Sequence, residues 1–425
     1  MKLKFISLLA LLLSGMVMAQ KTVVEKYGRL QVNGSHVTSE TGEKISLAGM
    51  SFFWSSFQDD GGKFYSKQNA KQVVDHLVDD WGVSIVRAAI GVDEADFNQG
   101  LLNNFNGAVQ KARNVIDAAI DRGIYVIADF HTHYAERYPD VANRFFDIIS
   151  KEYGDKDNLI YEIFNEPLGN GGGKVLTPWP TVKDYASKVI PTIRRNDSNN
   201  LIIVGTPTWS QDVDKAAASR IQGDSNLAYT MHFYANTHTQ WLRDRTARAM
   251  QDGIAIFVTE WGTVDASGNG GFNQQESLAW LQFLRDNNIS HLNWSISDKN
   301  ESASVINPGQ NTQGLLNNRL TQSGQFIRTE ILKQKVALNT LSVDEFDTNS
   351  SLSIYPVPTT SELTISAPIA LKNIHVVSLT GQIIMDQTVS TSSEKKIDVQ
   401  QLAAGTYILS VETAEGVFRK SFVKN

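Results

Sequence analysis

The stretch Leu159-Ile-Tyr-Glu-Ile-Phe-Asn-Glu-Pro167 sets the pattern from which the fold of this 425-residue chain can be predicted. It is a short apolar run that ends in polar residues, and similar runs recur between residues 45 and 298. Short runs rich in Val, Ile, Phe and Tyr are typical of parallel strands buried on both faces. The other runs are Ile45–Trp54, Ser84–Ile90, Tyr125–His131, Leu201–Trp209, Leu227–Tyr234, Ala255–Trp261 and His291–Asp298, which makes eight in all.

Helical patterns separate these runs. In Ala108–Arg122 the apolar residues recur at intervals of three and four, and Gly123 is placed to end the helix. Gln72–Trp81 and Gln275–Asn287 show the same periodicity. Eight strand–helix repeats predict an α/β fold, a (β/α)₈ barrel, over residues 20–336.

The N-terminal end has the pattern of an export signal. Lys2 and Lys4 precede the apolar run Phe5–Leu13, and small residues follow up to Ala19, so residues 1–19 are assigned to a signal peptide. The apolar run is too short to span a bilayer, which needs about 20 residues. No other segment approaches that length, so we expect no integral membrane segment.

The C-terminal end predicts a second domain. Residues 337–351 are polar, as is typical of a linker. Residues 352–425 show alternating apolar and polar positions punctuated by Gly381, Gly405 and Gly416, which predicts a small all-β sandwich.

Composition narrows the function. The net charge of −6 argues against a nucleic-acid partner, since such proteins usually present a basic surface. The chain has no cysteine, which excludes disulfides, thiolate chemistry and cysteine metal sites. We expect no cofactor and no bound metal.

Polar residues gather where the predicted strands end, and in a barrel these ends build the active site. The fourth run ends in Asn165-Glu166-Pro167, and the seventh ends in Thr259-Glu260-Trp261. Paired carboxylates are what glycoside hydrolysis requires, since one protonates the leaving oxygen and the other attacks the anomeric carbon. The alternative is that one glutamate is only an ion-pair partner. Polar and aromatic residues in matching positions argue against this alternative: Arg87, His131, His133, His232, Tyr234 and Trp294.

Seven motifs carry a resemblance to a known family. Taken in order over about 300 residues, they resemble bacterial endoglucanases of glycoside hydrolase family 5. The motifs are Leu47–Trp54, Val86–Val92, Asp129–His133, Tyr161–Pro167, His232–Ala235, Val258–Thr263 and Asn293–Glu301.

The resemblance implies a role for each matching residue. Glu166 would be the general acid/base and Glu260 the nucleophile, with Asn165 holding the sugar 2-hydroxyl. Arg87 and Tyr234 would hydrogen-bond Glu260 and keep it ionised while Glu166 stays protonated. The anomeric configuration would then be retained, with the carboxylates about 5–5.5 Å apart.

Other residues would complete the cleft. The resemblance implies His131 and His232 in the polar shell and Trp294 beneath the cleaved sugar. Tryptophans make good platforms for the C–H faces of sugars. We therefore expect Trp54 and Trp209 in flanking subsites, and Lys299 and Glu301 at the hydroxyls of a distal sugar.

The last 75 or so residues resemble the sorting domain of the bacterial type IX secretion system. The motifs are Ile354–Thr359, Leu379–Ile384, Leu402–Ile408 and Lys420–Lys424. The resemblance implies an address read by the secretion machinery and a protein that is extracellular or attached to the cell surface. A carbohydrate-binding module is the competing interpretation, but this segment contains no Trp.

The sequence therefore predicts a monomeric, endo-acting retaining glycosidase that cleaves β-1,4-glucosidic bonds in cellulose and related β-glucans by double displacement. The last barrel motif favours glucan as the polysaccharide partner, and β-mannanase activity is the runner-up. A sugar-binding module without catalysis is a further alternative. A metal-dependent barrel hydrolase is another, with His131, His133, His232, Glu166 and Asp298 as ligands.

Overall fold

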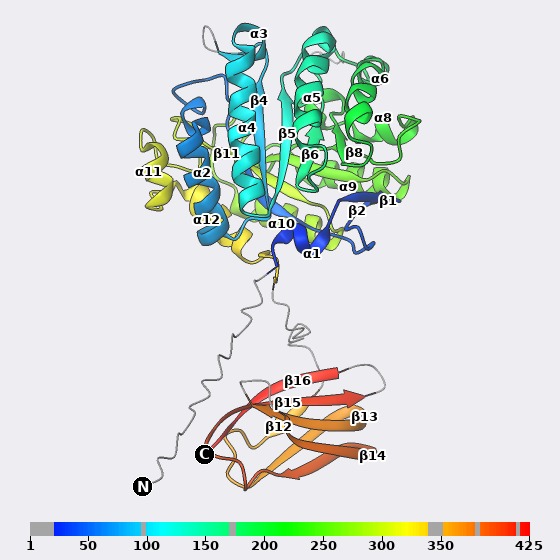
Figure 1. The fold of residues 1–425 in the computed structure, drawn as a ribbon, viewed down its shortest axis with the longest axis vertical. Helices are drawn as coiled ribbons and strands as arrows, with labels where there is room; N and C mark the ends of the chain where they lie inside the picture. The colour runs from blue at the N-terminus through cyan, green and yellow to red at the C-terminus, as the bar shows by residue number, and fades with distance from the viewer. Residues whose placement is uncertain (1–20, 95–98, 170–175, 339–351, 379–382, 414–416) are drawn as a thin grey trace, which may run out of the picture. The chain divides into compact units, whose positions relative to one another are not determined.

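The computed structural model describes residues 21–94, 99–169, 176–338, 352–378, 383–413 and 417–425 (Figure 1). These residues form two compact units that divide between Leu338 and Asn339. The expected signal peptide, residues 1–19, lies outside the described residues, as does most of the expected linker. None of the helices in the described ranges is long and apolar enough to cross a membrane.

The first unit is the expected (β/α)₈ barrel. Each strand pairs in parallel with the next along the chain, and the last strand, β11, returns to pair with the first, β3. The short strand β9 (Phe233–Tyr234) adds to the carboxyl end of β10. The barrel strands are β3 (Ala48–Phe52), β4 (Ile85–Gly91), β5 (Tyr125–His131), β6 (Leu159–Glu162), β7 (Ile202–Val204), β8 (Leu227–Thr230), β10 (Ile256–Gly262) and β11 (His291–Ile296).

All eight predicted strands are confirmed, and they are buried on both faces, as the apolar runs predicted. Every residue of these eight strands is buried, because helices cover the outside of the barrel and side chains fill its interior. Most predicted runs extend beyond the carboxyl ends of their strands. Those extra residues are where the strands pass into the loops that carry polar groups.

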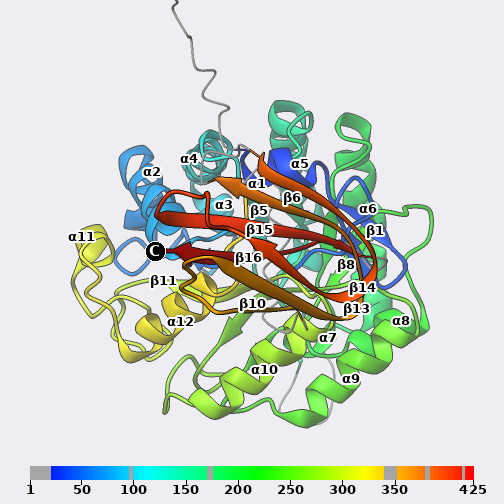
Figure 2. The same ribbon diagram turned by 90° about the horizontal axis from the view of Figure 1, so that it is seen from below.

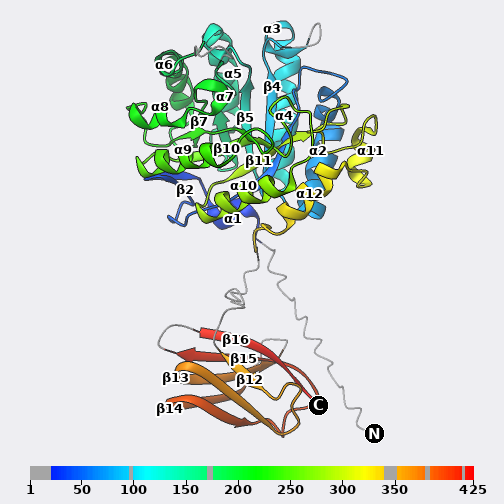
Figure 3. The same ribbon diagram turned by 180° about the vertical axis from the view of Figure 1, so that it is seen from behind.

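Helices on the connections surround the barrel (Figures 2 and 3). The predicted helix over residues 108–122 is α4, which begins after Asn104, whose side chain accepts from Gly107 N. Gly123 follows it with φ +61°, a conformation that favours glycine. The helices on the connections are α2 (Lys67–His76), α4 (Phe105–Asp121), α5 (Pro139–Tyr153), α6 (Trp179–Asn196), α8 (Val213–Ala218), α9 (Gln240–Gln251), α10 (Gln274–Asp286) and α12 (Gln322–Leu332).

A short N-terminal segment covers the end of the barrel where the strands begin. It consists of α1 (Val23–Tyr27) and the hairpin of β1 (Gln31–Asn33) and β2 (His36–Thr38). Asn226, just before β8, ties it down by accepting from Val32 N at 2.7 Å and donating to Leu30 O at 3.0 Å. The opposite end of the barrel is left for the long loops.

The second unit is the expected all-β domain, an antiparallel sheet in the order β12-β13-β15-β16 with β14 on β13. Its pairing shifts register between Ser366 and Leu371, where β13 is irregular. It has its own core, in which Leu363, Ile374, Leu409 and Phe422 are buried. The strands are β12 (Ser353–Tyr355), β13 (Glu362–Ser378), β14 (Ile383–Asp398), β15 (Gly405–Thr413) and β16 (Val417–Lys424).

The closest backbone approach in the barrel predicts a sensitive position. A Cβ on Gly49 of β3 would lie 1.8 Å from the carbonyl oxygen of Ile85 in β4. We therefore expect Gly49→Ala to lower the free energy of unfolding by about 3 kcal/mol or more, since β3 must move off β4. Gly271→Ala is the control, because nothing lies within 4 Å of its Cβ, and it should change stability by less than about 0.5 kcal/mol. Equal melting temperatures for the two variants would contradict this account.

Candidate active site

Two cavities meet at the carboxyl ends of the barrel strands. One, of about 360 Å³, contains Trp209 and is called the Trp209 cavity. The other, of about 220 Å³, contains Trp54 and is called the Trp54 cavity. Glu166 and Glu260 line both, so the two carboxylates lie where the cavities join.

Glu260 lies on β10 and is held at both oxygens. The hydroxyl of Tyr234 donates to Oε1 at 2.8 Å, and Arg87 donates to Oε2 at 3.1 Å. Both contacts are those expected from the sequence. The side chain is only 7% exposed, so a carboxylate here depends on these two donors for the hydrogen bonds that water would otherwise provide.

Arg87, on β4, is the centre of a buried charge cluster. Its side chain is completely buried. Burial alone would lower the pKa of its guanidinium, but three carboxylates around it raise that pKa instead. Its acceptors are Asp129 (2.9 Å), Glu162 (2.7 Å), Glu260 (3.1 Å), Asn165 Oδ1 (2.7 Å) and Ser51 Oγ (3.4 Å).

Asp129 and Glu162 take part in this cluster without lying in either cavity. Both are completely buried, and burial raises the pKa of each to about 7, against the opposing effect of Arg87. Asp129 Oδ2 lies 2.5 Å from His131 Nδ1. Glu162 Oε1 accepts from the hydroxyl of Thr259 at 2.6 Å.

Glu166 follows β6 and contacts two imidazoles, one at each oxygen. Oε1 lies 2.9 Å from His232 Nδ1, and Oε2 lies 3.2 Å from His133 Nε2. Glu94 lies on the far side of His133, with Oε1 2.6 Å from Nδ1. Between two carboxylates the imidazole of His133 is favoured as a cation, and its pKa rises to about 10 although burial opposes this.

The order of the two carboxyl pKa values differs from the expectation. Burial would raise the pKa of Glu166, but the two imidazoles lower it well below its usual value. Burial and the charge of Glu166 raise the pKa of Glu260. These shifts run opposite to the expected order, in which Glu166 keeps the proton. Each oxygen of Glu166 lies within hydrogen-bond distance of a histidine nitrogen.

Aromatic rings form the walls of the Trp54 cavity. Trp54 packs edge-on against His131 with 4.0 Å between ring centroids, and His131 stacks on Trp294 at 5.2 Å. Lys299 and Glu301 line the same cavity and pair with each other at 3.3 Å. The structure therefore places Trp54, His131, Trp294, Lys299 and Glu301 around one cavity.

Trp209 is held in the other cavity by a strained turn. Thr208, Trp209 and Ser210 have φ values of 59°, 52° and 55°, in the left-handed region that non-glycine residues rarely adopt. Trp209 N donates to Pro167 O at 2.9 Å, and Ser210 Oγ donates to Asn165 O at 2.8 Å. The turn is thus tied to the segment that carries Glu166.

Five polar residues that hydrogen-bond to the charged groups and histidines of the site were not predicted from the sequence. Two of them, Asp129 and Glu162, are charged residues inside apolar runs, and this was a usable signal because a buried charge needs a partner. Asp129 also precedes His131 by two residues, which puts both on one face of β5. The others gave no comparable signal: Ser51, Glu94 and Thr259.

The metal ligand set that the sequence left open does not form as expected. Among the described residues, only Glu166, His232 and Glu260 bring three such ligand atoms together, within 4.8 Å of one another. Asp298 instead pairs with Lys63 at 2.5 Å, and His131 binds Asp129. The same limit means that one oxygen of Glu166 and one oxygen of Glu260 lie within 4.8 Å of each other.

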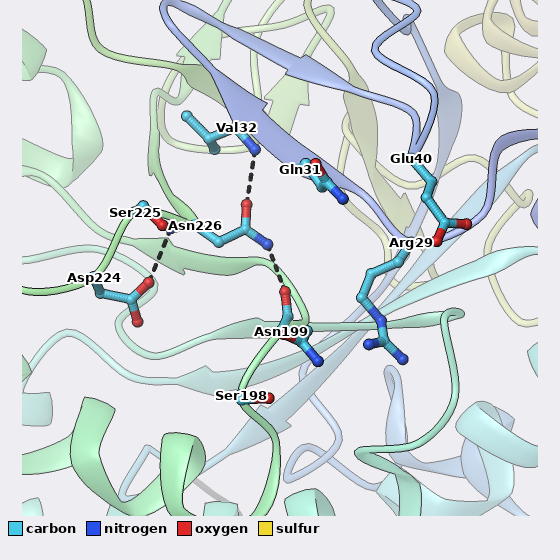
Figure 4. A pocket seen from close by; sticks show the side chains of 9 residues that line it. All are labelled: Arg29, Gln31, Val32, Glu40, Ser198, Asn199, Asp224, Ser225 and Asn226. Atoms are coloured by element: carbon cyan, nitrogen blue, oxygen red, sulfur yellow. Dashed lines mark hydrogen bonds between the residues drawn. The ribbon is translucent and has the colours of Figure 1, made fainter.

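A cavity of about 410 Å³ lies at the opposite end of the barrel, beside the β1–β2 hairpin (Figure 4). Its polar groups bind one another: Asn226 donates its side-chain amide to Asn199 O at 2.6 Å and its backbone N–H to Asp224 Oδ1 at 2.9 Å. Contacts at the start of barrel strands usually serve stability. The polar groups around this cavity therefore hold the N-terminal segment in place.

The pair of Glu94 and His133 predicts a measurable titration. Glu94→Gln should lower the pKa of His133 from about 10 toward its ordinary value of 6.5, because one of two facing carboxylates is lost. NMR of the ring nitrogens measures this, with the exposed Glu43→Gln as the control. Since the folded-state pKa is the higher one, the stabilisation is complete below pH 6.5 and is lost as pH rises toward 10. The stability difference between wild type and Glu94→Gln should shrink over that window. An unchanged His133 titration would refute the pairing.

Comparison with known proteins gives two family matches. Residues 38–300 match the model of cellulase (glycosyl hydrolase family 5), and residues 353–425 match the secretion system C-terminal sorting domain.

Individual relatives support the cellulase match. The chain is 47% identical over 304 residues to endoglucanase Z of Dickeya dadantii and 43% identical over 309 residues to an endoglucanase of Clostridium saccharobutylicum. These alignments cover 71% and 72% of this chain, and 66% and 65% of the relatives' lengths, so it spans about two thirds of each.

Solved structures are similar as well. A structure from Cytophaga hutchinsonii matches with a TM-score of 0.67 and 44% identity, covering 74% of this chain and 98% of that one. The catalytic domain of a Thermobifida fusca endoglucanase matches with a TM-score of 0.66 and 31% identity, covering 73% and 99%. By its barrel, its carboxylate pair and these matches, the chain belongs to glycosyl hydrolase family 5.

Proposed function

We propose that this protein is a secreted, endo-acting retaining β-1,4-glucanase. The observation that carries the proposal is the position of Glu166 and Glu260, with oxygens within 4.8 Å of each other at the junction of two cavities. A glucan chain bound through both cavities would place one of its glycosidic bonds between the two carboxylates. Cavities on both sides suit a cut within a chain.

In this proposal Glu260 is the nucleophile and Glu166 the acid/base. Tyr234 and Arg87 hold Glu260 in place and favour its ionised form as a sugar displaces water. Glu166 gives a proton to the leaving oxygen as Glu260 attacks the anomeric carbon, and then removes a proton from the water that hydrolyses the glycosyl intermediate. Asn165, held by Arg87, is within reach of the sugar 2-hydroxyl.

The remaining cleft residues are proposed to bind the flanking sugars. Trp294 would lie beneath the cleaved unit, and Trp54 and Trp209 would stack on sugars in the two cavities. Lys299 and Glu301 would bind hydroxyls of a distal sugar in the Trp54 cavity. Because the named relatives are endoglucanases, we favour β-1,4-glucan over mannan as the substrate.

We also propose a domain organisation in which each part of the chain has its own function. Residues 20–336 would be the catalytic domain of a monomer, 337–351 a linker, and 352–425 the address that the secretion machinery reads. The sorting-domain match over 353–425 supports export to the cell surface or beyond.

Substitution of each carboxylate tests the mechanism. Glu166→Gln should lower kcat/KM on barley β-glucan by about 10²–10⁴-fold, and Glu260→Gln by at least as much, since acid catalysis and covalent attack are lost. Glu43→Gln is the control, because Glu43 is exposed and lines neither cavity. Reducing-sugar release from carboxymethylcellulose, β-glucan and galactomannan, with and without EDTA, is the measurement.

The outcomes separate the alternatives. Preference for galactomannan would keep the mechanism and change the substrate. Full activity of either glutamine variant, or loss of wild-type activity with EDTA, would overturn the two-carboxylate mechanism.

Transfer of the C-terminal segment tests the export proposal. A reporter with a signal peptide and residues 352–425 should reach the cell surface or medium of a host with a type IX system. The same reporter ending before Lys420 lacks five of the eight residues of β16 and should remain in the periplasm. Equal location of the two fusions would refute the assignment.

A further inference from the structure

A chain of hydrogen bonds leads away from Glu166 into the barrel interior. Glu166 Oε1 lies 2.9 Å from His232 Nδ1, and His232 Nε2 lies 2.8 Å from Thr259 Oγ1. The hydroxyl of Thr259 in turn donates to Glu162 Oε1 at 2.6 Å. His232, Thr259 and Glu162 are at most 1% exposed, so water does not compete for these bonds.

The partners of Thr259 settle where its hydrogen points. Its hydroxyl has three neighbours, the third being the hydroxyl of Thr230 at 2.6 Å. A hydroxyl has one hydrogen and accepts two. Glu162 also accepts from Arg87 Nε at 2.7 Å, which favours its carboxylate form, and a carboxylate only accepts. Thr259 therefore donates to Glu162 and accepts from Thr230 and His232.

This direction fixes the proton of His232. Because Thr259 accepts at Nε2, that nitrogen must carry hydrogen, and a neutral His232 then faces Glu166 with a bare Nδ1. A carboxylate and a bare nitrogen at 2.9 Å repel each other, so the bond must hold a second proton. That proton can leave without making the imidazole an anion.

We propose that Thr259 and Glu162 are positioning residues that keep a proton on His232 Nε2, so that the proton between His232 and Glu166 is free for transfer to the leaving group. This inference rests on the proposed glycosidase function. As the bond between the anomeric carbon and the leaving oxygen breaks, the proton passes to that oxygen and Glu260 bonds to the anomeric carbon. In the second step Glu166 takes a proton from water, whose oxygen displaces Glu260, and the initial state returns.

The opposite arrangement of hydrogens is available to the same atoms. With a donor in place of the Glu162 carboxylate, Thr259 would donate to His232 Nε2, and the one hydrogen of a neutral His232 would lie on Nδ1. Glu166 would then be a carboxylate whose only nearby proton on that side is fixed to the ring. Which arrangement forms depends on whether the group at position 162 accepts from Thr259 or donates to it. A single substitution can therefore select between them.

The charged groups around His232 decide how readily it is protonated. Its ring faces the carboxylates of Glu166 and Glu162 directly. At longer range the carboxylate of Glu260 favours a proton on His232, and the guanidinium of Arg87 opposes it. Burial opposes protonation of His232, but the acidic groups raise its pKa. The raised pKa of His232 favours a proton in its bond to Glu166.

Three variants test the proposal. Thr259→Val has the same shape without the hydroxyl, so it removes the acceptor at His232 Nε2. In Glu162→Gln, Arg87 orients the amide oxygen toward itself and the amide N–H toward Thr259, which reverses the chain. Thr259→Ser keeps the hydroxyl and is the matched control. Each is assayed as the full chain, with its melting temperature measured.

Two substrates separate acid catalysis from folding or binding. Cellotetraose needs a proton on its leaving oxygen, whereas the leaving group of 2,4-dinitrophenyl β-cellobioside needs none. We expect Thr259→Val and Glu162→Gln to lower kcat/KM at least about tenfold on cellotetraose and less than about threefold on the dinitrophenyl substrate. Thr259→Ser should stay within about threefold on both.

The pH dependence gives an independent measurement. The basic limb of kcat/KM on cellotetraose should move down by about one pH unit in Thr259→Val and Glu162→Gln, because the transferable proton is lost more easily. It should not move in Thr259→Ser.

Equal losses on both substrates, unchanged basic limbs, or full activity on cellotetraose would overturn the proposal. A wild type inactive on both substrates would overturn the proposed function itself, which separates the two failures.

Discussion

Arg87 carries its guanidinium into the barrel interior, where it is completely buried, and a charge in that position is stable only with partners. Three carboxylates and an amide surround it, and each leads to a different part of the site. Glu260 is contacted directly. Asp129 binds His131, which stacks on Trp294. Glu162 leads through Thr259 and His232 to Glu166. The need to neutralise one buried cation therefore fixes the positions of Glu260, Trp294 and Glu166 together.

The barrel meets this need because its strands end side by side. Arg87 on β4, Asp129 on β5 and Glu162 on β6 come from three consecutive strands, and Glu260 comes from β10 across the barrel. No one segment could place all four. The helices outside and the buried strands keep water away, so each hydrogen bond in the cluster counts for more than it would at the surface. The polar site is as much a product of the closed barrel as of its own residues.

The sequence predicted what depends on local pattern and missed what depends on register. Strands such as β5 were found because both faces are buried, and Glu166 and Glu260 because they lie at the ends of such apolar runs. The partners Glu162 and Thr259 lie within predicted strands, but their contact spans 97 residues and depends on how β6, β8 and β10 align. Glu94 lies in a loop that no periodicity places. The direction of the Glu166 pKa shift depends in part on His133, whose second partner Glu94 could not be predicted from the sequence.

The turn at Thr208–Ser210 shows how stability elsewhere supports this arrangement. Three successive left-handed residues cost on the order of 1–3 kcal/mol each, a large share of the stability of an ordinary domain. Their hydrogen bonds go to Pro167 and Asn165, the residues on either side of Glu166. A relaxed turn would release that segment and let Glu166 move away from His232. The large barrel core can offset this strain, so the position of Glu166 depends on the fold as a whole and not only on the residues that touch it.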